Sequence, residues 1–266
     1  MSLVSVQNVS HLYVGADHAV TWALRAVNLE LSKGTLTCIV GPSGCGKTTL
    51  LQLIAGFVEP TFGEVRLNSE PIRGPGPDRS VVFQEYALFP WLTARQNVEF
   101  GLRATGMPIA ERHNRSNELL AIMKLEAAAD KYPHELSGGM RQRVAVARGL
   151  AIRPAVLLMD EPFAAVDAIT RMTLQEELLR LWRELDLSIV FITHNVDEAV
   201  YLSNQVVVMS AHPGTVKEMV SIDFPHPRDR GSAIFAKWYS RISSSMHQSE
   251  HKNLVRHDHV CAAPEY

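Results

Sequence analysis

The decapeptide "GPSGCGKTTL" at residues 41–50 constrains the fold of this chain more than any other stretch. It follows the apolar run "LTCIV" and precedes "LQLIAGF", so it joins a predicted strand to a predicted helix. Glycine loses more backbone freedom on folding than any other residue, and three glycines within six residues therefore indicate a loop with a specific task. The stretch matches G-x-x-x-x-G-K-[ST], whose backbone N–H groups cradle phosphate at a helix start. A chance glycine-rich turn is the alternative, which the flanking strand and helix disfavour.

Within this loop the lysine and the first threonine have separate predicted tasks. Lys47 is expected to reach the β- and γ-phosphates of a nucleotide, and the Thr48 hydroxyl is expected to bind Mg²⁺. Cys45 is interpreted as a small space-filler that thiol reagents reach when nucleotide is absent. The predicted phosphate-binding residues are Gly41, Pro42, Ser43, Gly44, Cys45, Gly46, Lys47, Thr48 and Thr49.

Composition indicates a folded α/β protein. The 266 residues are 46% hydrophobic, enough for one large domain or two modest ones, and the formal charge of −2 comes without a basic block. Nucleic acid is therefore not an expected partner. The sequence contains neither an apolar run of about 18 residues nor a signal-peptide pattern, which predicts a cytosolic chain. Cys38, Cys45 and Cys261 lack metal-ligand spacing, and their odd number argues against a disulfide framework.

Hydrophobic periodicity predicts two kinds of sheet. Alternation in "LVSVQNV" and "WALRAVNLELS" indicates antiparallel strands, whereas "LTCIV", "VVF", "AVLLM" and "SIVFIT" are continuous apolar runs typical of a covered parallel sheet. Helical periodicity in "TLLQLIAGF", "RQRVAVARGLAI" and "MTLQEELLRLWREL" supplies crossover helices. The expected fold is an α/β P-loop NTPase with a mainly parallel core sheet, an N-terminal antiparallel β subdomain and an inserted α-helical subdomain.

The predicted domain boundaries follow from the same patterns. One ATPase domain is expected over residues 3–235, with a helical insertion at about 88–150. Residues 236–266 are polar and rich in histidine, and a loose solvated tail is predicted there in preference to a metal site.

Two carboxylates end the apolar run "AVLLM". Asp160 and Glu161 lie where an open α/β sheet presents its ligands. Asp160 is expected to support Mg²⁺, and Glu161 is expected to orient or deprotonate the water that attacks the γ-phosphate. The alternative is that the acids only cap the following turn, for which Pro162 gives some support.

Further motifs make a family resemblance specific. "LSGGM" at 136–140, followed by "RQRVAVARGL", resembles the signature motif of ABC-type ATPases, and the likeness extends over about residues 3–228. The resemblance implies that Gln84 contacts Mg²⁺ and senses the γ-phosphate, and that His194 is the switch histidine. It also implies that Tyr13 stacks on adenine, although Trp22 is a competitor for this role. Taken alone, each of these three residues could equally be structural.

The resemblance also implies a head-to-tail homodimer with two ATP molecules at its interface. Ser137, Gly138 and Gly139 of one copy would close over ATP held by the loop of the other, with Asp167 nearby. The sequence departs from the family pattern at three places. "PFAAVDA" replaces the common Gly-Ala-Leu-Asp or Ser-Ala-Leu-Asp, Met140 replaces Gln, and Asn195 replaces Asp. None of these changes removes a predicted phosphate-binding group, but the altered loop puts contacts across the dimer in doubt.

The remaining motifs narrow the expected function. "GPGPDRSVVFQEYALFPWLTARQNVEFGL" and "FPHPRDR" resemble ATPase subunits of bacterial nitrate, aliphatic sulfonate and taurine importers. The implied partners are separate integral membrane permease subunits and, indirectly, a periplasmic or extracellular solute-binding protein, which places the chain on the cytoplasmic face of the inner membrane. The apolar cluster "LFPWL" could receive a permease helix or could be core packing. A soluble ABC-type ATPase acting on nucleic acid or ribosomes and a P-loop kinase are the competing hypotheses.

Overall fold

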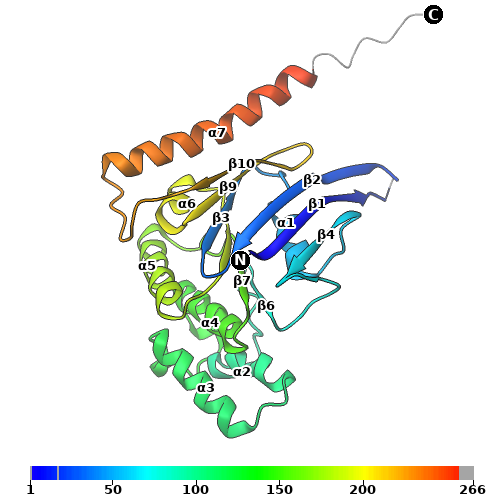
Figure 1. Cartoon of the computed structure of the whole chain (residues 1–266). Coiled ribbons are helices and arrows are strands. Elements are labelled where there is room, and N and C mark those ends of the chain that lie inside the picture. The colour runs from blue at the N-terminus through cyan, green and yellow to red at the C-terminus, as the bar shows by residue number, and fades with distance from the viewer. Residues whose placement is uncertain (1, 17, 258–266) are drawn as a thin grey trace, which may run out of the picture. The chain divides into compact units, whose positions relative to one another are not determined.

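The computed structural model of the protein describes residues 2–16 and 18–257, which form two compact units (Figure 1). The first unit comprises Met1–Gly74 and Ile192–Tyr266, and the second comprises Pro75–Phe191. Cys261 and the last histidine of the predicted tail, His259, lie outside the described residues.

An antiparallel sheet occupies the N-terminal part of the first unit. Its order is β2-β1-β4-β5, and Val6 of β1 pairs with Leu29 on one side and Val65 on the other. These three side chains are buried because apolar residues alternate with polar ones along the strands. The bounds are β1 (Ser2–Val14), β2 (Val20–Ser32), β4 (Phe62–Leu67) and β5 (Glu70–Pro71).

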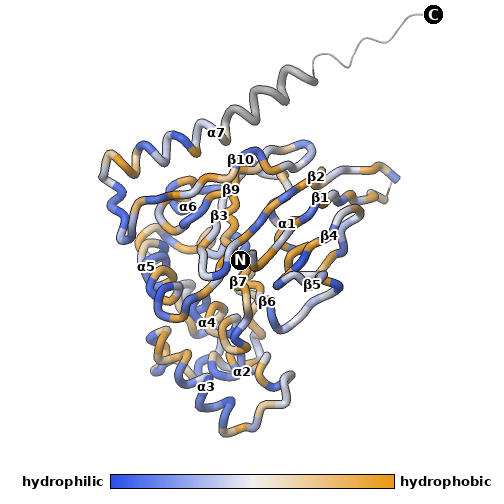
Figure 2. Tube along the Cα trace, viewed as in Figure 1, coloured by the Kyte–Doolittle hydropathy of each residue, from blue (hydrophilic) through white to orange (hydrophobic). Residues whose placement is uncertain are grey.

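A second group of strands in the same unit carries the glycine-rich loop. β9 pairs with β3 in parallel and with β10 in antiparallel fashion. Every residue of β3 is buried, and Figure 2 shows the hydrophobic character of this strand. Helix α1 follows the loop, and α6 follows His194. The bounds are β3 (Leu36–Val40), α1 (Lys47–Ala55), α6 (Val196–Leu202), β9 (Gln205–Ser210) and β10 (Thr215–Ser221).

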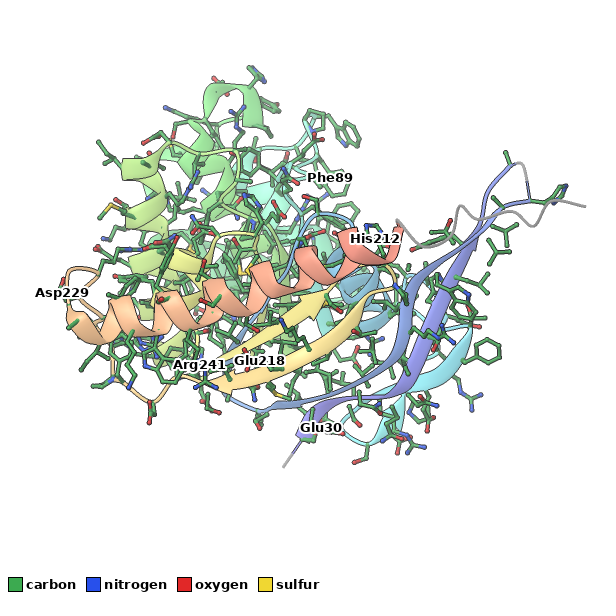
Figure 3. The ribbon with its side chains drawn as sticks, turned by 90° about the horizontal axis from the view of Figure 1, so that it is seen from above. Glu30, Phe89, His212, Glu218, Asp229 and Arg241 are labelled. Atoms are coloured by element: carbon green, nitrogen blue, oxygen red, sulfur yellow. The ribbon has the colours of Figure 1, made fainter. Side chains whose placement is uncertain are left out.

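Helix α7 (Ala233–His257) occupies most of the segment predicted as a loose tail. Lys217 of β10 donates to the Ser245 carbonyl at 2.6 Å, and Arg241 lies 3.9 Å from Glu218 (Figure 3). The buried side chains of Phe235 and Ile242 add apolar packing. The sequence therefore underestimates the regular structure of this segment.

The second unit contains strands β6 and β7, which pair in parallel, and most of β8. Between β6 and β7 the chain is mainly helical, and α5 connects β7 to β8. This unit is larger than the predicted insertion of about 88–150 because it includes these strands and α5. The bounds are β6 (Arg79–Val82), α2 (Ala94–Ala104), α3 (Ile109–Ile122), η1 (Glu126–Ala128), η2 (Pro133–Glu135), α4 (Gly138–Ala151), β7 (Val156–Asp160), α5 (Ala168–Glu184) and β8 (Ile189–Ile192).

Among the described helices, none combines the length and the apolar character needed to span a bilayer.

Candidate nucleotide-binding site

Two glycines of the 41–50 loop are required by close packing. Gly46 has φ +87°, and a Cβ atom there would lie 2.8 Å from the Ala23 carbonyl oxygen. A Cβ atom on Gly41 would lie 2.6 Å from Cys45 Sγ. Any side chain at either position would therefore displace the loop.

Helix α1 begins at this loop without a capping side chain. Its N-cap is Gly46, and its first turn contains no acidic residue. By contrast, the Thr93 hydroxyl caps α2 and the Asp167 carboxylate caps α5. Because the N-cap residue of α1 has no side chain to cap the helix, the helix start, with the positive end of its dipole, suits a phosphate group.

Lys47 places its charge inside the loop. The side chain is buried, and Nζ donates to the carbonyls of Gly41 at 2.8 Å and Pro42 at 3.1 Å. The neighbouring Cys45 is fully buried, with Sγ 3.9 Å from this nitrogen, and burial raises the pKa of its thiol. The burial of Cys45 agrees with its interpretation as a small space-filler, and both the burial and the raised pKa disfavour reaction with thiol reagents.

Tyr13 contacts a residue of the 41–49 loop, whereas its competitor Trp22 packs on a ring of β4. The Tyr13 hydroxyl is 3.4 Å from Thr49 Oγ1, and its ring meets the buried His11 edge-on at 4.8 Å. Trp22 instead stacks on Phe62, with the ring centroids 6.2 Å apart. This arrangement favours Tyr13 as the aromatic residue beside the nucleotide.

His194 is held between a strand end and a helix start. The preceding Thr193 donates its N–H to the Ile39 carbonyl at 3.2 Å, which brings the segment alongside the end of β3. The following Asn195 accepts from the Asp197 N–H at 2.9 Å and caps α6. Asn therefore performs the capping that Asp would perform at this position.

In the second unit, Gln84, Asp160 and Glu161 follow neighbouring parallel strands. Val82 of β6 is in register with Met159 of β7, so the three residues emerge at the same edge of the sheet. Glu161 has φ +42°, a conformation that costs non-glycine residues energy and is found most often at functional sites.

The residues of the "LSGGM" motif pack against segments that follow Gln84 and Asp167 within the second unit. Ser137 caps α4 by accepting from the Met140 N–H at 3.3 Å. A Cβ atom on Gly138 would lie 3.4 Å from the Tyr86 hydroxyl, and one on Gly139 would lie 2.7 Å from Thr170 Cγ2. The motif is thus packed against the segments that follow Gln84 and Asp167.

Asp167 caps α5 through its carboxylate. Oδ1 accepts from the N–H groups of Thr170 at 3.0 Å and Ile169 at 3.1 Å. The hydrogen bonds from Thr170, and then that from the Ile169 backbone, lower the pKa of this carboxyl. The acid that the altered "PFAAVDA" loop retains therefore has a structural task in this chain.

The predicted residues form two groups, one in each unit. The first group contains Tyr13, the 41–49 loop and His194, and the second contains Gln84, Ser137 to Gly139, Asp160, Glu161 and Asp167. Sequence reasoning missed Gly214, where a Cβ atom would lie 2.3 Å from the Cys45 carbonyl oxygen. Its place in "HPG", a turn signal before a strand, was the available clue.

The donor set suits Mg²⁺ better than a transition metal. Among the side chains that the structure describes, those of residues 2–16 and 18–246, no three His, Cys, Asp or Glu side chains gather as a metal site. The predicted ligands are instead the oxygens of the exposed Thr48 hydroxyl, the Gln84 amide and the Asp160 carboxylate. Mg²⁺ prefers oxygen ligands and keeps several waters, so one carboxylate is sufficient.

Comparison with known proteins identifies the family. A family model described as ABC transporter matches residues 24–164. An uncharacterized ABC transporter ATP-binding protein of Methanocaldococcus jannaschii is 47% identical over 251 residues, covering 94% of each chain. The nitrate import ATP-binding protein of Synechocystis is 43% identical, covering 93% of this chain and 96% of that protein. The bicarbonate transport ATP-binding protein of Synechococcus elongatus is 46% identical, covering 85% and 82%.

Solved structures agree with these sequence matches. An ATP-binding cassette described as dimeric and bound to ADP and Pi matches with a TM-score of 0.73 at 32% identity, covering 84% of this chain and all of that one. A cassette of the Clostridium perfringens ABC transporter complex cbiONQ matches with a TM-score of 0.75 at 28% identity, covering 94% and 99%.

This chain belongs to the ABC transporter family. The predicted fold class, with its antiparallel β subdomain and mainly parallel sheet, is confirmed, as is the predicted class of ATP hydrolase.

Proposed function

We propose that this chain is the ATP-hydrolysing subunit of a bacterial importer for a small anion of the nitrate type. The observation that carries the ATPase part is the loop at 41–50: two glycines that admit no Cβ, a helix start without a capping side chain, and a buried ammonium. Together these features form a preorganised site for the phosphates of a nucleotide.

The catalytic work is divided between the two groups of residues. Lys47 and the loop amides bind the phosphates, and Tyr13 receives the adenine. Glu161 orients the attacking water and takes its proton, while His194 contacts the γ-phosphate. Thr48, Gln84 and Asp160 would hold Mg²⁺, which when bound would supply charge neutralisation at the phosphate oxygens.

The working unit in this proposal is a head-to-tail homodimer. Ser137 is exposed at the start of α4, where the helix dipole favours an anion. Closing this helix start over a nucleotide held by the partner subunit would join two copies only while the γ-phosphate is present. The solved relative described as a dimer with ADP and Pi supports this arrangement.

The proposed partners are separate permease subunits, which place the chain on the cytoplasmic face of the inner membrane, and a solute-binding protein that acts through them. An aromatic cluster that follows Gln84 in the chain offers a contact surface for a permease helix: the exposed rings of Phe100 and Trp91 lie 4.3 Å and 5.6 Å, between centroids, from the half-buried ring of Phe89. The names of the nitrate and bicarbonate import relatives support small oxyanions as cargo. Taurine and aliphatic sulfonates remain candidates from the sequence motifs.

The test is reconstitution of the chain with its permease and binding-protein partners in lipid vesicles. Nitrate, bicarbonate, taurine and an alkanesulfonate are added in turn, and ATP hydrolysis and solute uptake are measured. We expect one oxyanion to stimulate both activities. Hydrolysis without stimulation by any solute would leave an ATPase and refute the importer.

Nucleic-acid or ribosome-linked ATPase activity is not favoured. Salt-dependent stimulation of hydrolysis by DNA or RNA would nevertheless revive that alternative.

A further inference from the structure

The segment after Gln84 makes a sharp turn. Tyr86 and Ala87 have φ values of +61° and +45°, which are unfavourable for residues with a Cβ atom. The Ala87 N–H donates to the Glu85 carbonyl at 2.6 Å. Contacts from outside the turn must hold such a conformation in place.

Arg148, in the last turn of α4, supplies those contacts. Its guanidinium donates to the carbonyls of Ala87 at 2.6 Å and Tyr86 at 3.1 Å. It also lies 5.5 Å from the centre of the Phe89 ring. One half-buried side chain therefore contacts the backbone two and three residues after Gln84 and also the half-buried Phe89, which lies beside the exposed Trp91 and Phe100 of the proposed permease surface.

The opposite end of α4 reaches the same turn. The Tyr86 hydroxyl adjoins Gly138 of the signature motif, and Arg141 lies 5.6 Å from the centre of the Tyr86 ring. Ten positions separate Gly138 from Arg148, a span of about 15 Å along a helix. Tyr86 and Arg148 thus attach the turn to α4 at two separated points.

Beyond the turn, Asn97 fixes the segment that carries Phe89. Its fully buried amide accepts from the Phe89 N–H at 2.9 Å and donates to the carbonyls of Phe89 at 3.2 Å and Leu92 at 3.0 Å. Asn97 belongs to α2, so this segment follows any movement of that helix.

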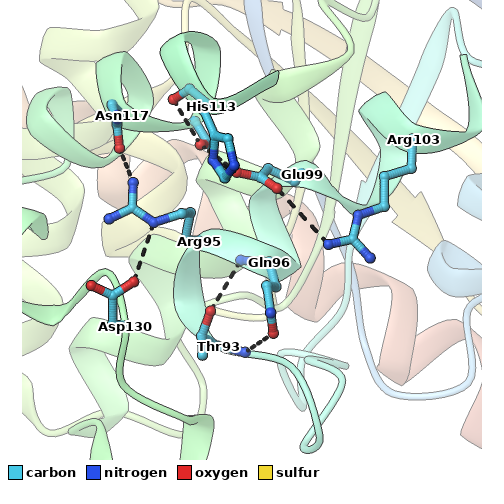
Figure 4. A network of polar contacts seen from close by, with 9 residues as sticks. Thr93, Arg95, Gln96, Glu99, Arg103, His113, Asn117 and Asp130 are labelled. Carbon is cyan, nitrogen blue, oxygen red and sulfur yellow. Dashed lines mark hydrogen bonds and ion pairs between the residues drawn. The ribbon is translucent and has the colours of Figure 1, made fainter. Parts of the chain in front are cut away.

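A polar network anchors α2 to its neighbours (Figure 4). The buried Glu99 accepts from Ser116 at 3.0 Å and lies 2.8 Å from His113 Nδ1, both on α3. Arg95, also on α2, has its Nε atom 3.2 Å from Oδ1 of Asp130. With α2 held in this way, Arg148 directly connects α4 to the turn after Gln84, at the other end of α4 from the contacts that Tyr86 makes.

We propose that Arg148 is a positioning residue for ATP hydrolysis: it holds Gln84 in place relative to the signature helix, and it connects that helix to the Phe89 surface. This inference rests on the proposed function, since it assigns to Gln84 a task in hydrolysis. Arg148 contacts the carbonyls of Tyr86 and Ala87 and the Phe89 ring, so its proposed role is to position other groups.

The experiment is a double-mutant cycle on the full chain, using Arg148→Met, Gln84→Ala and the double variant. Arg148→Met should lower kcat about tenfold with KM for ATP changed by less than about twofold, because the phosphate-binding loop is untouched. Adding Arg148→Met to Gln84→Ala should lower kcat by less than about twofold more, because both changes remove the same task. Arg148→Lys, which keeps a charged donor, should recover part of the loss.

The matched control is Arg180→Met. Arg180 also donates to a backbone carbonyl of this unit, that of Ile122 at 2.7 Å, but it does not contact the turn. The kcat of Arg180→Met should remain within about twofold of that of the unmodified chain. Urea unfolding of each variant tests for a folding defect.

Three results would overturn the inference: an unchanged kcat in Arg148→Met, an equal loss in Arg180→Met, or independent losses that multiply in the double variant. Failure of the proposed function gives a different result, because the unmodified chain would then not hydrolyse ATP.

Discussion

Lys47 is buried inside the 41–50 loop, with its ammonium donating to the carbonyls of Gly41 and Pro42. Lys47→Ala should therefore weaken ATP binding about tenfold or more, equivalent to about 1.4 kcal/mol, through loss of a charge-assisted hydrogen bond. Titration calorimetry measures this affinity. Lys33→Ala, which removes an exposed lysine from the turn before β3, is the control and should bind normally. Equal affinities in both variants would contradict the assignment of the loop.

Glu161 has the backbone geometry of a constrained site and follows the strand that ends in Asp160. Glu161→Gln should keep ATP affinity within about twofold and lower kcat about a hundredfold or more, because the amide cannot take a proton from water. Single-turnover hydrolysis and nucleotide binding test the two halves of this prediction. The control is Glu176→Gln, the same substitution on the exposed face of α5, and this variant should be fully active.

At the residue scale, the residues that could be predicted are those whose spacing along the chain is set by the ligand that they bind. The 41–50 loop is recognisable because glycines, Lys47 and Thr48 must follow one another at set intervals. Arg148 and Tyr86 were not recognisable, since 62 positions separate them and only the fold brings them together. The burial of Cys45 was not recognisable either, because burial is a property of packing and cannot be read from a local motif.

At the element scale, the Asp167 cap gives α5 a dependence on pH. The hydrogen bonds from Thr170 and Ile169 hold the pKa of Asp167 below its ordinary value of 3.8. A carboxyl with a lowered folded-state pKa stabilises the fold above its unfolded pKa, and that contribution is lost as pH falls through the folded pKa. Asp167→Ala should therefore lower the urea midpoint at pH 7, and its difference from the unmodified chain should narrow below pH 3.8.

The control for this cap is Asp167→Asn, because Asn also caps helices well. The urea midpoint of Asp167→Asn at pH 7 should lie close to that of the unmodified chain. A difference between Asp167→Ala and the unmodified chain that stays constant down to pH 3 would refute the role of the carboxylate charge.

Helices and strands with a strong hydrophobic periodicity were predictable from the sequence. Elements that depend on packing against the rest of the fold were not. The runs "LTCIV" and "AVLLM" became β3 and β7, and the amphipathic "RQRVAVARGLAI" became α4. Helix α7 was missed because much of its sequence is polar, with five serines and three histidines among its 25 residues, whereas the buried Phe235 and Ile242 pack it in the fold. Tertiary packing, more than intrinsic propensity, stabilises most protein helices.

At the scale of the whole molecule, the two groups of site residues predict a dimer that ATP controls. In a Glu161→Gln background, slow hydrolysis should let Mg-ATP hold two copies together, with a mass twice the 29.5 kDa of the chain. Adding Ser137→Glu should keep the chain monomeric, because a carboxylate at the start of α4 would repel the γ-phosphate bound by the partner. Light scattering after size-exclusion chromatography measures both masses.

The control for the dimer is Ser221→Glu, which adds the same charge at an exposed position at the end of β10. It should dimerise with ATP as the parent does, and all three proteins should be monomeric with ADP. Loss of the dimer in both glutamate variants would show a general effect of charge. A dimer that persists in Ser137→Glu would mean that the signature motif does not close over nucleotide, and hydrolysis would then be the work of a single chain.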